Sequence, residues 1–174
     1  MRLITVIGIK NAGKTTLTVA LASEYVRRGR RVMTIKHGHH PADVDRPGSD
    51  TFRHFREARA ERTLIAAPDL RVLFERTADD YDAVALARRY MDGADIVLCE
   101  GYKRAALPKV EVWRKVIGGR PIYDPAAPNA KEWVALVVDD RTAGEDARCP
   151  VLAFSDTNWL QTLANLVWER ALIL

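Results

Sequence analysis

The chain has 174 residues, and 48% of them are hydrophobic, which is enough apolar material for the core of one domain. Lysine and arginine number 27 against 23 acidic residues, and a mild, unclustered net charge of +4 argues against a nucleic-acid-binding surface. No run approaches the ~18 apolar residues of a membrane span, and Cys99 and Cys149 form no disulfide or zinc-finger pattern. We therefore expect a single cytoplasmic domain over residues 1–174.

Apolar runs alternate with helical patterns in the first half of the chain. Residues 3–7 are too short a run for a signal peptide and predict a buried strand. Apolar residues then recur at helical spacing as far as Gly29, and residues 31–36 predict a second strand. After a polar loop over 37–50, the pattern predicts a short helix over 51–60, strands over 63–66 and 71–74, a helix over 83–91 and a strand over 96–99.

The second half begins with residues 109–114, where charged and apolar side chains alternate as in an exposed or edge strand. Residues 118–129 predict a loop, and two further buried strands are expected over 135–138 and 151–154. Ser155 or Asp156 is expected to cap the final helix. The apolar face of that helix consists of Leu160, Leu163, Ala164, Val167 and Ala171.

The alternation of strand and helix predicts an α/β fold with a mostly parallel sheet flanked by helices on both faces. In such sheets, ligands bind at the carboxyl ends of the strands. The loops after Ile7, Lys36 and Cys99 should therefore meet at one edge.

The first of these loops matches the P-loop pattern G-x-x-x-x-G-K-[ST] without a gap from Gly8 to Thr15, between an apolar strand and an amphipathic helix. This context predicts the three-layer fold of P-loop NTPases. Backbone amides and Lys14 would hold phosphates, and the Thr15 hydroxyl would bind Mg²⁺. Lys10 could instead be a solvated loop residue or contact a partner subunit. The predicted nucleotide-binding residues are Gly8, Lys10, Asn11, Ala12, Gly13, Lys14, Thr15 and Thr16.

A second acidic element lies at the end of a predicted strand. Glu100 follows an apolar run that starts after Asp95, so it should lie at the functional edge and Asp95 at the opposite one. A P-loop protein needs an acid near Mg²⁺, and we favour that role for Glu100 over a charge that serves solubility alone.

The loop after the second predicted strand is rich in histidine and aspartate. His37, His39 and His40 could bind a transition metal together with an aspartate. A phosphate-facing or solvated loop is the simpler interpretation. A third possibility is a switch in which Asp45 reaches Mg²⁺ when triphosphate is bound. The predicted metal ligands are therefore Thr15, Glu100 and Asp45.

Three motifs occur in order along the chain. They are the P-loop, the run Lys36-His37-Gly38-His39-His40 with Asp45 and Pro47-Gly48-Ser49-Asp50-Thr51, and the run Glu100-Gly101-Tyr102-Lys103 with Pro108-Lys109-Val110-Glu111-Val112-Trp113-Arg114. Together they resemble the MobB family of molybdopterin-guanine dinucleotide biosynthesis adapter proteins. The resemblance covers most of residues 3–155, and its second and third motifs are more specific than the widely shared P-loop.

The resemblance implies a GTP-binding, weakly hydrolysing and usually dimeric protein that assists the enzyme attaching GMP to molybdopterin. It places the phosphate site on residues 8–16, the acidic strand end on Glu100 and the loop acid on Asp45. The implied ligands are GTP and Mg²⁺. The implied partners are the molybdenum cofactor nucleotidyltransferase, other cofactor-maturation proteins and a second copy of the chain, and neither nucleic acid nor a membrane is expected.

The chain departs from the family pattern at two positions. Arg59 in Glu57-Ala58-Arg59-Ala60 stands where the family usually has the glycine of Ala-Gly-Ala, and Lys10 replaces a small or polar residue. The Asn-Lys-x-Asp run that reads guanine in many GTPases is absent from the sequence, and residues 129–132 do not fit it. The choice of GTP over ATP therefore rests on the resemblance.

We expect any GTP hydrolysis to be slow, because no glutamine or arginine is assigned to position water or to stabilise the transition state. Three other functions compete with that of a slow GTPase. A small-molecule kinase could use a lid formed by Arg53, Arg56, Arg59 and Arg62, although the first three share one predicted helix face and suit a solvated face or an anionic partner better. A metal-delivery GTPase would use the histidines. A scaffold would need the nucleotide only for stability. An exposed Trp113 is the predicted homodimer contact.

Overall fold

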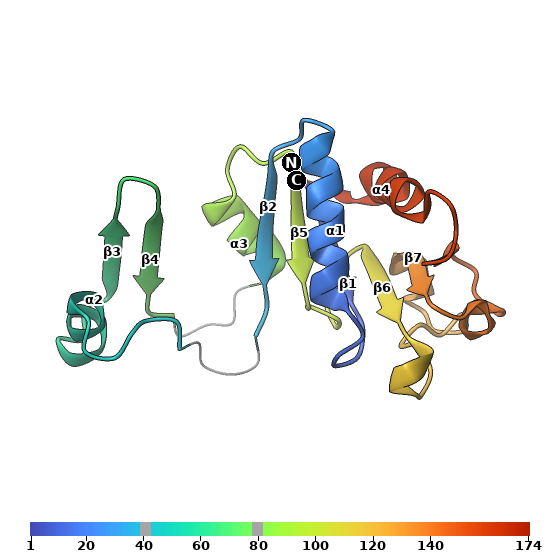
Figure 1. Ribbon diagram of the computed structural model, residues 1–174, viewed down its shortest axis with the longest axis horizontal. Coiled ribbons are helices and arrows are strands. Elements are labelled where there is room, and N and C mark those ends of the chain that lie inside the picture. Colours follow the sequence, from blue (N-terminus) through green and yellow to red (C-terminus); the bar gives the residue numbers. More distant parts are fainter. Residues whose placement is uncertain (39–42, 78–81) are drawn as a thin grey trace. The chain divides into compact units, whose positions relative to one another are not determined.

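The computed structural model describes residues 1–38, 43–77 and 82–174, and the chain forms two compact units. Unit 1 comprises Met1–His37 and Asp82–Leu174, and unit 2 comprises Gly38–Tyr81. Each unit has a sheet of its own (Figure 1). The prediction of one nucleotide-binding domain over the whole chain stays a prediction.

Unit 1 is built on a seven-stranded sheet in the order β2-β5-β1-β6-β7-β8, with β9 pairing with β1. Every pairing is parallel except the antiparallel contact between β1 and β9, so the predicted mostly parallel sheet is confirmed. The short strand β9 has no counterpart among the predicted elements. The strands are β1 (Arg2–Ile7), β2 (Val32–Lys36), β5 (Ile96–Glu100), β6 (Lys109–Trp113), β7 (Trp133–Val138), β8 (Val151–Ala153) and β9 (Leu172–Ile173).

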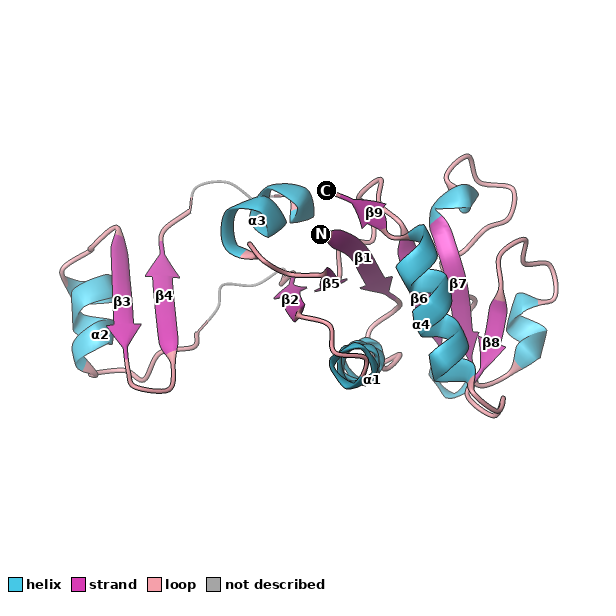
Figure 2. Ribbon diagram, turned by 90° about the horizontal axis from the view of Figure 1, so that it is seen from above, coloured by secondary structure: helices cyan, strands magenta, loops and turns pink. Residues whose placement is uncertain are grey.

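Helices cover both faces of this sheet, as the sequence predicts. The helices α1 (Lys14–Arg27) and α4 (Trp159–Arg170) share a core with β1, β6 and β7, whereas α3 (Ala83–Tyr90) packs with β5 on the opposite face (Figure 2). Burying apolar side chains on both faces is what stabilises a parallel sheet. Short 3₁₀ turns lie at Lys115–Ile117, Ala130–Glu132 and Arg141–Gly144.

Strand β6 is the largest departure from the predicted fold, because it lies between β1 and β7 and not at an edge. All five of its residues are buried, including Lys109 at 0% and Glu111 at 1% exposure. Each charge has partners outside the strand. The Lys109 ammonium donates to the Glu132 carboxylate and the Ala105 carbonyl, both at 2.7 Å. Buried charges are tolerated only with such partners.

The Glu111 carboxylate holds the loop that follows β6 against the sheet. It accepts hydrogen bonds from the backbone amides of Ile122 at 2.6 Å and Tyr123 at 2.9 Å, and from the Trp133 indole at 2.9 Å. Burial raises the pKa of Glu111, and these three donors oppose the rise by stabilising the carboxylate. The charged residues of β6 are therefore structural anchors.

The start of α4 also differs from the prediction. Its N-cap is Asn158, at a φ of 63°, and not Ser155 or Asp156. The Asp156 carboxylate instead accepts the Ala153 amide at 2.8 Å and pairs with Arg141 at 2.6 Å. This carboxylate fixes the end of β8 and does not cap the helix.

Unit 2 consists of an antiparallel hairpin and one helical segment. Strands β3 (Arg62–Ala66) and β4 (Arg71–Glu75) flank the predicted turn. The helix α2 (Asp50–Phe52) continues into a π-helical turn at Arg53–Glu57, so the helical segment is shorter than the predicted 51–60. The Ser49 side chain caps α2 by accepting the Phe52 amide at 3.1 Å, and the rings of Phe55 and Phe74 lie 5.8 Å apart.

Arg59 lies just beyond this helical segment with a φ of 58°. That region of backbone space favours glycine because a side chain clashes with the neighbouring carbonyl. The glycine that the resemblance places here therefore fits the backbone better than the arginine does.

Replacing this arginine tests the strain directly. Arg59→Gly should raise the free energy of unfolding by roughly 0.5–1 kcal/mol, since the left-handed conformation costs about 1–2 kcal/mol for arginine and glycine stabilises the unfolded chain by about 0.4–1 kcal/mol. Urea titration measures the change. Arg59→Ala is the matched control, because it removes the same side chain and keeps the strained backbone. Equal stabilisation by both substitutions would contradict the explanation.

Candidate functional site

The loop between β1 and α1 has the backbone that its glycines predict. Gly8 has a φ of 151°, and a Cβ there would lie 2.5 Å from the Val112 carbonyl oxygen of β6. Gly13 has a φ of 99° and Asn11 a φ of 65°. These conformations suit residues without a side chain, or asparagine, whose short polar side chain tolerates the left-handed region. The loop turns tightly beside β6 and enters the helix at Gly13.

The start of α1 is open to an anion. Gly13 is the N-cap, and no side chain in the described part of the chain caps the helix. The hydroxyl-bearing Thr15 and Thr16 are exposed in the first turn. The first amides of a helix lack partners within the helix and lie at its positive end, so an exposed, uncapped start suits phosphate.

Lys14 lies within this loop and is held by it. Its ammonium donates to the Ile9 carbonyl at 2.8 Å. Partial burial lowers the pKa of Lys14, Glu100 raises it, and the neighbouring Lys103 and Lys36 lower it further. Lys14, Lys36 and Lys103 therefore repel one another near the single carboxylate of Glu100. The negative charge of a bound polyphosphate would reduce this repulsion.

Glu100, at the carboxyl end of β5, meets the P-loop as the sequence predicts. Its carboxylate accepts the Thr15 hydroxyl at 2.8 Å and lies 3.8 Å from the Lys36 ammonium. The register explains the contact, because Glu100 lies level with Val6 of β1 on one side and with Lys36 of β2 on the other. Asp95 lies at the opposite end of β5 and accepts the Arg31 amide at 2.8 Å, which agrees with its predicted remoteness.

The pair formed by Thr15 and Glu100 fits Mg²⁺. Mg²⁺ prefers oxygen ligands at about 2.0–2.1 Å in an octahedron, so two adjacent ligand atoms lie about 2.9 Å apart. The two oxygens of this pair are separated by 2.8 Å. A hydroxyl and a carboxylate, with phosphates and waters in the remaining positions, are the usual protein contribution to such a site.

The loops after β2 and β5 form a second contact beside Glu100. The His37 amide donates to the Glu100 carbonyl at 2.9 Å, and the His37 and Tyr102 rings lie 4.4 Å apart at 31°. Gly101 allows this approach, since a Cβ there would lie 3.0 Å from the His37 Cβ. Sequence reasoning did not assign Lys36, Tyr102 or Lys103 to the site, although all three belong to the motifs quoted for the resemblance.

The histidine cluster is only partly described. His39 and His40 lie outside the described residues, and His37 packs against Tyr102. Within residues 1–38, 43–77 and 82–174, no group of three or more histidine, cysteine or acidic side chains is arranged to hold a metal. The described residues therefore provide no support for a transition-metal site.

Asp45 belongs to unit 2, where it organises the turn before α2. One carboxylate oxygen accepts the Arg46 amide at 2.8 Å and the Ser49 and Thr51 hydroxyls at 3.0 and 3.3 Å. The other oxygen is buried and has no hydrogen-bond partner among the described residues. Its role as a magnesium ligand stays a prediction.

The arginine run that a kinase could use as a lid has a different local structure from the predicted helix face. The helical segment ends at Glu57, so Arg59 does not share a helix face with Arg53 and Arg56. Arg53 pairs with Glu57 at 3.2 Å, and Arg62 pairs with Glu75 at 2.7 Å across the hairpin. Arg56 lies over the Phe55 ring, 5.8 Å from its centroid, so Arg53, Arg56 and Arg62 all have partners within unit 2.

Comparison with known proteins identifies the family of the chain. A family model described as molybdopterin guanine dinucleotide synthesis protein B (MobB) matches residues 3–139. The molybdopterin-guanine dinucleotide biosynthesis adapter protein of Escherichia coli is 34% identical over 90% of this chain and 86% of its own. The protein of the same name from Haemophilus influenzae is 31% identical over 91% of this chain and 89% of its own.

Solved structures show the same fold. The MobB homolog from Bacillus stearothermophilus superposes with a TM-score of 0.67 at 25% identity. The match covers 98% of this chain and 100% of that chain. Bacillus subtilis MobB gives a TM-score of 0.70 at 20% identity, with 99% of each chain covered. In the described part of this chain, no helix is both long and apolar enough to cross a bilayer.

The contact between Glu100 and Thr15 yields a test of the metal site. Glu100→Gln should weaken Mg²⁺ binding in the presence of a nucleoside triphosphate by about 10–100-fold, because the amide removes a negative charge next to the cation. Titration calorimetry at fixed nucleotide measures it. Asp95→Asn, at the other end of the same strand, is the matched control and should leave Mg²⁺ affinity unchanged. Equal effects of the two substitutions would remove Glu100 from the site.

Proposed function

The chain belongs to the MobB family of molybdopterin guanine dinucleotide synthesis proteins, and on this premise we propose that it is a GTP-binding adapter with weak GTPase activity. It would assist the nucleotidyltransferase that attaches GMP to molybdopterin, together with other cofactor-maturation proteins, in the cytoplasm. Its relatives in Escherichia coli and Haemophilus influenzae are named as adapters of molybdopterin-guanine dinucleotide biosynthesis.

The contact between Thr15 and Glu100 is the observation that carries the proposal. It joins the P-loop to the end of β5 at 2.8 Å, beside the uncapped start of α1 and the Lys14 ammonium. The amides of α1 and Lys14 would bind the phosphates, and the hydroxyl and carboxylate would hold Mg²⁺. When bound, Mg²⁺ would neutralise charge on the outer phosphates. Lys10 is exposed in the same loop, and its contact with nucleotide belongs to the proposal.

Slow hydrolysis is part of this proposal, and the position of the one glutamine in the sequence supports it. Efficient GTPases orient the attacking water with a glutamine or stabilise the transition state with an arginine. The sequence has a single glutamine, Gln161, and its carbonyl accepts a hydrogen bond from Arg28, just past the C-terminal end of α1. The P-loop is at the other end of this 14-residue helix, about 20 Å away. Gln161 is therefore too distant to orient water at the phosphates.

The preference for guanine rests on the family. Residues 129–132 precede β7, so they do not follow a strand at the carboxyl edge of the sheet. Glu132 is engaged with the buried Lys109 at 2.7 Å. This placement agrees with the mismatch between the segment and the guanine-reading motif.

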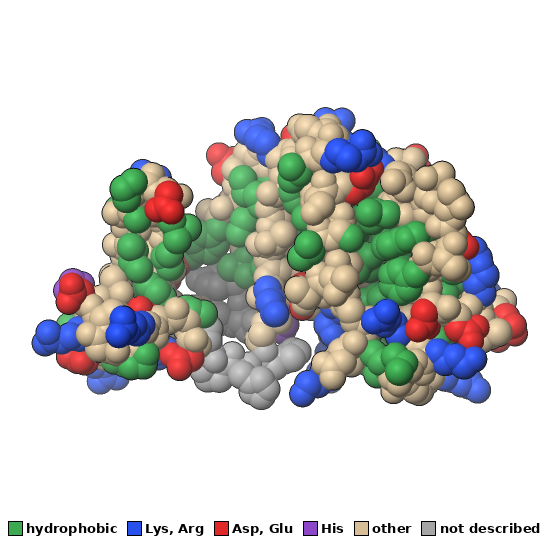
Figure 3. All heavy atoms as spheres, viewed as in Figure 1, with side chains coloured by type: hydrophobic (Ala, Val, Ile, Leu, Met, Phe, Trp, Pro, Cys, Tyr) green, Lys and Arg blue, Asp and Glu red, His purple; other side chains and the backbone are tan. Residues whose placement is uncertain are grey.

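We also propose a homodimer, through a surface other than the one the sequence indicated. Trp113 is only 6% exposed, so the prediction of an exposed interface tryptophan was wrong. In unit 2, the cross-strand pair of Leu64 and Leu73 is 59% and 45% exposed, and Figure 3 shows apolar side chains along the hairpin. A two-stranded hairpin is marginally stable by itself, and a second copy could extend its sheet and cover the leucines.

Nucleotide binding tests the main proposal. The protein with Mg²⁺ should bind GTP more tightly than ATP in side-by-side calorimetry. Lys14→Ala should weaken GTP binding by at least ~10-fold, because it removes a charged donor to phosphate. The exposed Lys131 provides the control Lys131→Ala. Absence of saturable binding, or partner-free hydrolysis as fast as a kinase at ~1 s⁻¹ or more, would contradict the proposal.

Light scattering at micromolar concentration tests the dimer. The unmodified chain should have twice the mass of one copy, and Leu64→Lys combined with Leu73→Lys should shift it toward a monomer, because burying a lysine without a partner is costly. Val19→Lys on α1 is a control, since Val19 is also 59% exposed. A monomeric unmodified protein, or dissociation by the control alone, would overturn this interface.

A further inference from the structure

Lys36 shares the carboxylate of Glu100 with the P-loop, and the function proposed above gives this lysine no role. It is the last residue of β2 and lies level with Glu100 at the end of β5. Its ammonium is 3.8 Å from one carboxylate oxygen, Oε1, whereas the Thr15 hydroxyl donates to the other, Oε2, at 2.8 Å. One carboxylate therefore connects the P-loop with a lysine from a different strand.

The ammonium of Lys36 is available for another anion. Its side chain is 72% exposed, and 3.8 Å is too long for a hydrogen bond, so this ammonium makes none within residues 1–38, 43–77 and 82–174. An ammonium has three donors. Exposed ion pairs contribute little to stability, so an anion that binds more closely could replace Glu100 as the partner of Lys36.

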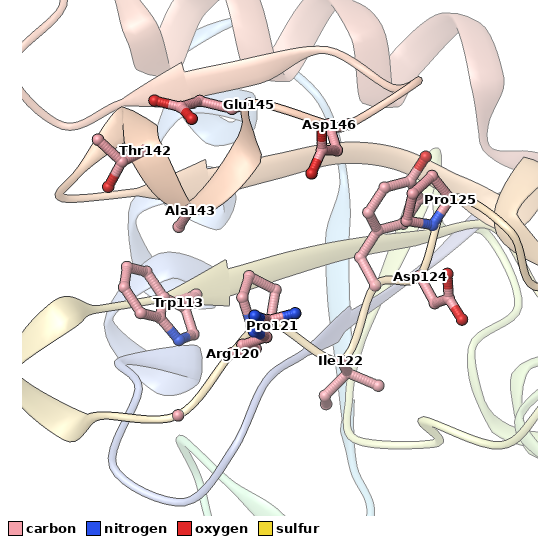
Figure 4. A pocket seen from close by; sticks show the side chains of 13 residues that line it. Trp113, Arg120, Pro121, Ile122, Asp124, Pro125, Thr142, Ala143, Glu145 and Asp146 are labelled. Atoms are coloured by element: carbon pink, nitrogen blue, oxygen red, sulfur yellow. The ribbon is translucent and has the colours of Figure 1, made fainter.

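Carboxylates predominate on the β6 side of the P-loop. A cavity of about 690 Å³ begins at Trp113, the last residue of β6, and lies between segments that follow β6 and β7 (Figure 4). The charged residues that line it are one arginine and three acids, namely Arg120, Asp124, Glu145 and Asp146. An excess of carboxylates repels a polyphosphate, so the phosphates beyond the P-loop should not extend to this side.

The opposite sign prevails on the β5 side of the P-loop. Lys36 ends β2 and Lys103 follows β5, and both side chains are exposed. Besides burial, which lowers it, the pKa of Lys14 is raised by Glu100 and lowered by Lys103 and Lys36. The charges of these two lysines therefore reach the P-loop, and the outer phosphates of a ligand should lie on their side.

We propose that Lys36 binds the terminal phosphate of a nucleoside triphosphate and thereby distinguishes the triphosphate from the diphosphate. Thr15 and Glu100 would hold Mg²⁺, which bridges the outer phosphates, so the terminal phosphate would lie near the carboxylate that Lys36 already lies beside. Bound Mg²⁺ would also neutralise Glu100, and the ammonium would then gain more from the phosphate than from the carboxylate. The inference rests on the proposed function, because it assigns a residue to the nucleotide of that function.

Comparison of GTP with GDP tests this role. Lys36→Met keeps a side chain of similar length and removes the charge. In calorimetry with Mg²⁺, it should weaken GTP binding at least ~10-fold and leave GDP binding within ~2-fold of the unmodified chain, because only GTP carries the terminal phosphate. The unchanged GDP affinity would also show that the variant is folded. Lys36→Arg keeps the charge and should retain most of the GTP affinity, and Lys131→Met, in the turn before β7, is the matched control.

Three results would overturn the inference alone. Equal losses of GTP and GDP affinity in Lys36→Met would indicate a general effect on the loop, and an unchanged GTP affinity would indicate a solvated lysine. A loss of GTP affinity that Lys131→Met shares would indicate an effect of net charge. Failure of the proposed function would look different, since the unmodified chain would then bind no Mg²⁺-GTP, and both the function and the role of Lys36 would be overturned.

Discussion

The uncapped, positively polarised start of α1 is the constraint on which the rest of the structure depends. The start of this helix can face a ligand only if the chain turns tightly between β1 and α1. Gly8 allows that turn, because it lies too close to the Val112 carbonyl for any side chain. Strand β6 must therefore lie next to β1, and the loops after β2 and β5 must meet at the same edge. The parallel sheet fixes these positions at once, which is why ligands of such folds bind at the carboxyl ends of the strands. Family membership agrees with this arrangement.

Most of the fold could be predicted from periodicity, and the largest exception, strand β6, has a long-range cause. The strand-loop-helix unit at the N-terminus, the buried β5 and β7 and the hairpin of unit 2 all carry strong local patterns. Strand β6 reads as an edge strand because Lys109 and Glu111 alternate with valines. They are buried because Glu132 and the amides of residues 122 and 123 reach them from more than ten positions away. A local pattern contains no information about such partners.

The candidate site was likewise only partly predictable from the sequence. The P-loop and Glu100 were predicted because short-range spacing and a strand end define them. Lys36, Tyr102 and Lys103 were not assigned, since their position beside the loop depends on how β2 pairs with β5 and on the turn at Gly101. Arg59 was noted as a departure, but only the backbone, at a φ of 58°, explains why glycine suits the position.

The hydrogen bonds of Lys14 and Thr15 have a consequence for how tightly the loop would hold the proposed ligands. The Lys14 ammonium donates to the Ile9 carbonyl and the Thr15 hydroxyl donates to the Glu100 carboxylate, so both groups already have partners within the chain. Under the proposed function, ligand binding would exchange partners, with one internal contact given up for each external one gained. Each new contact would then contribute only the difference between its old and its new partner, which favours modest affinity and ready release.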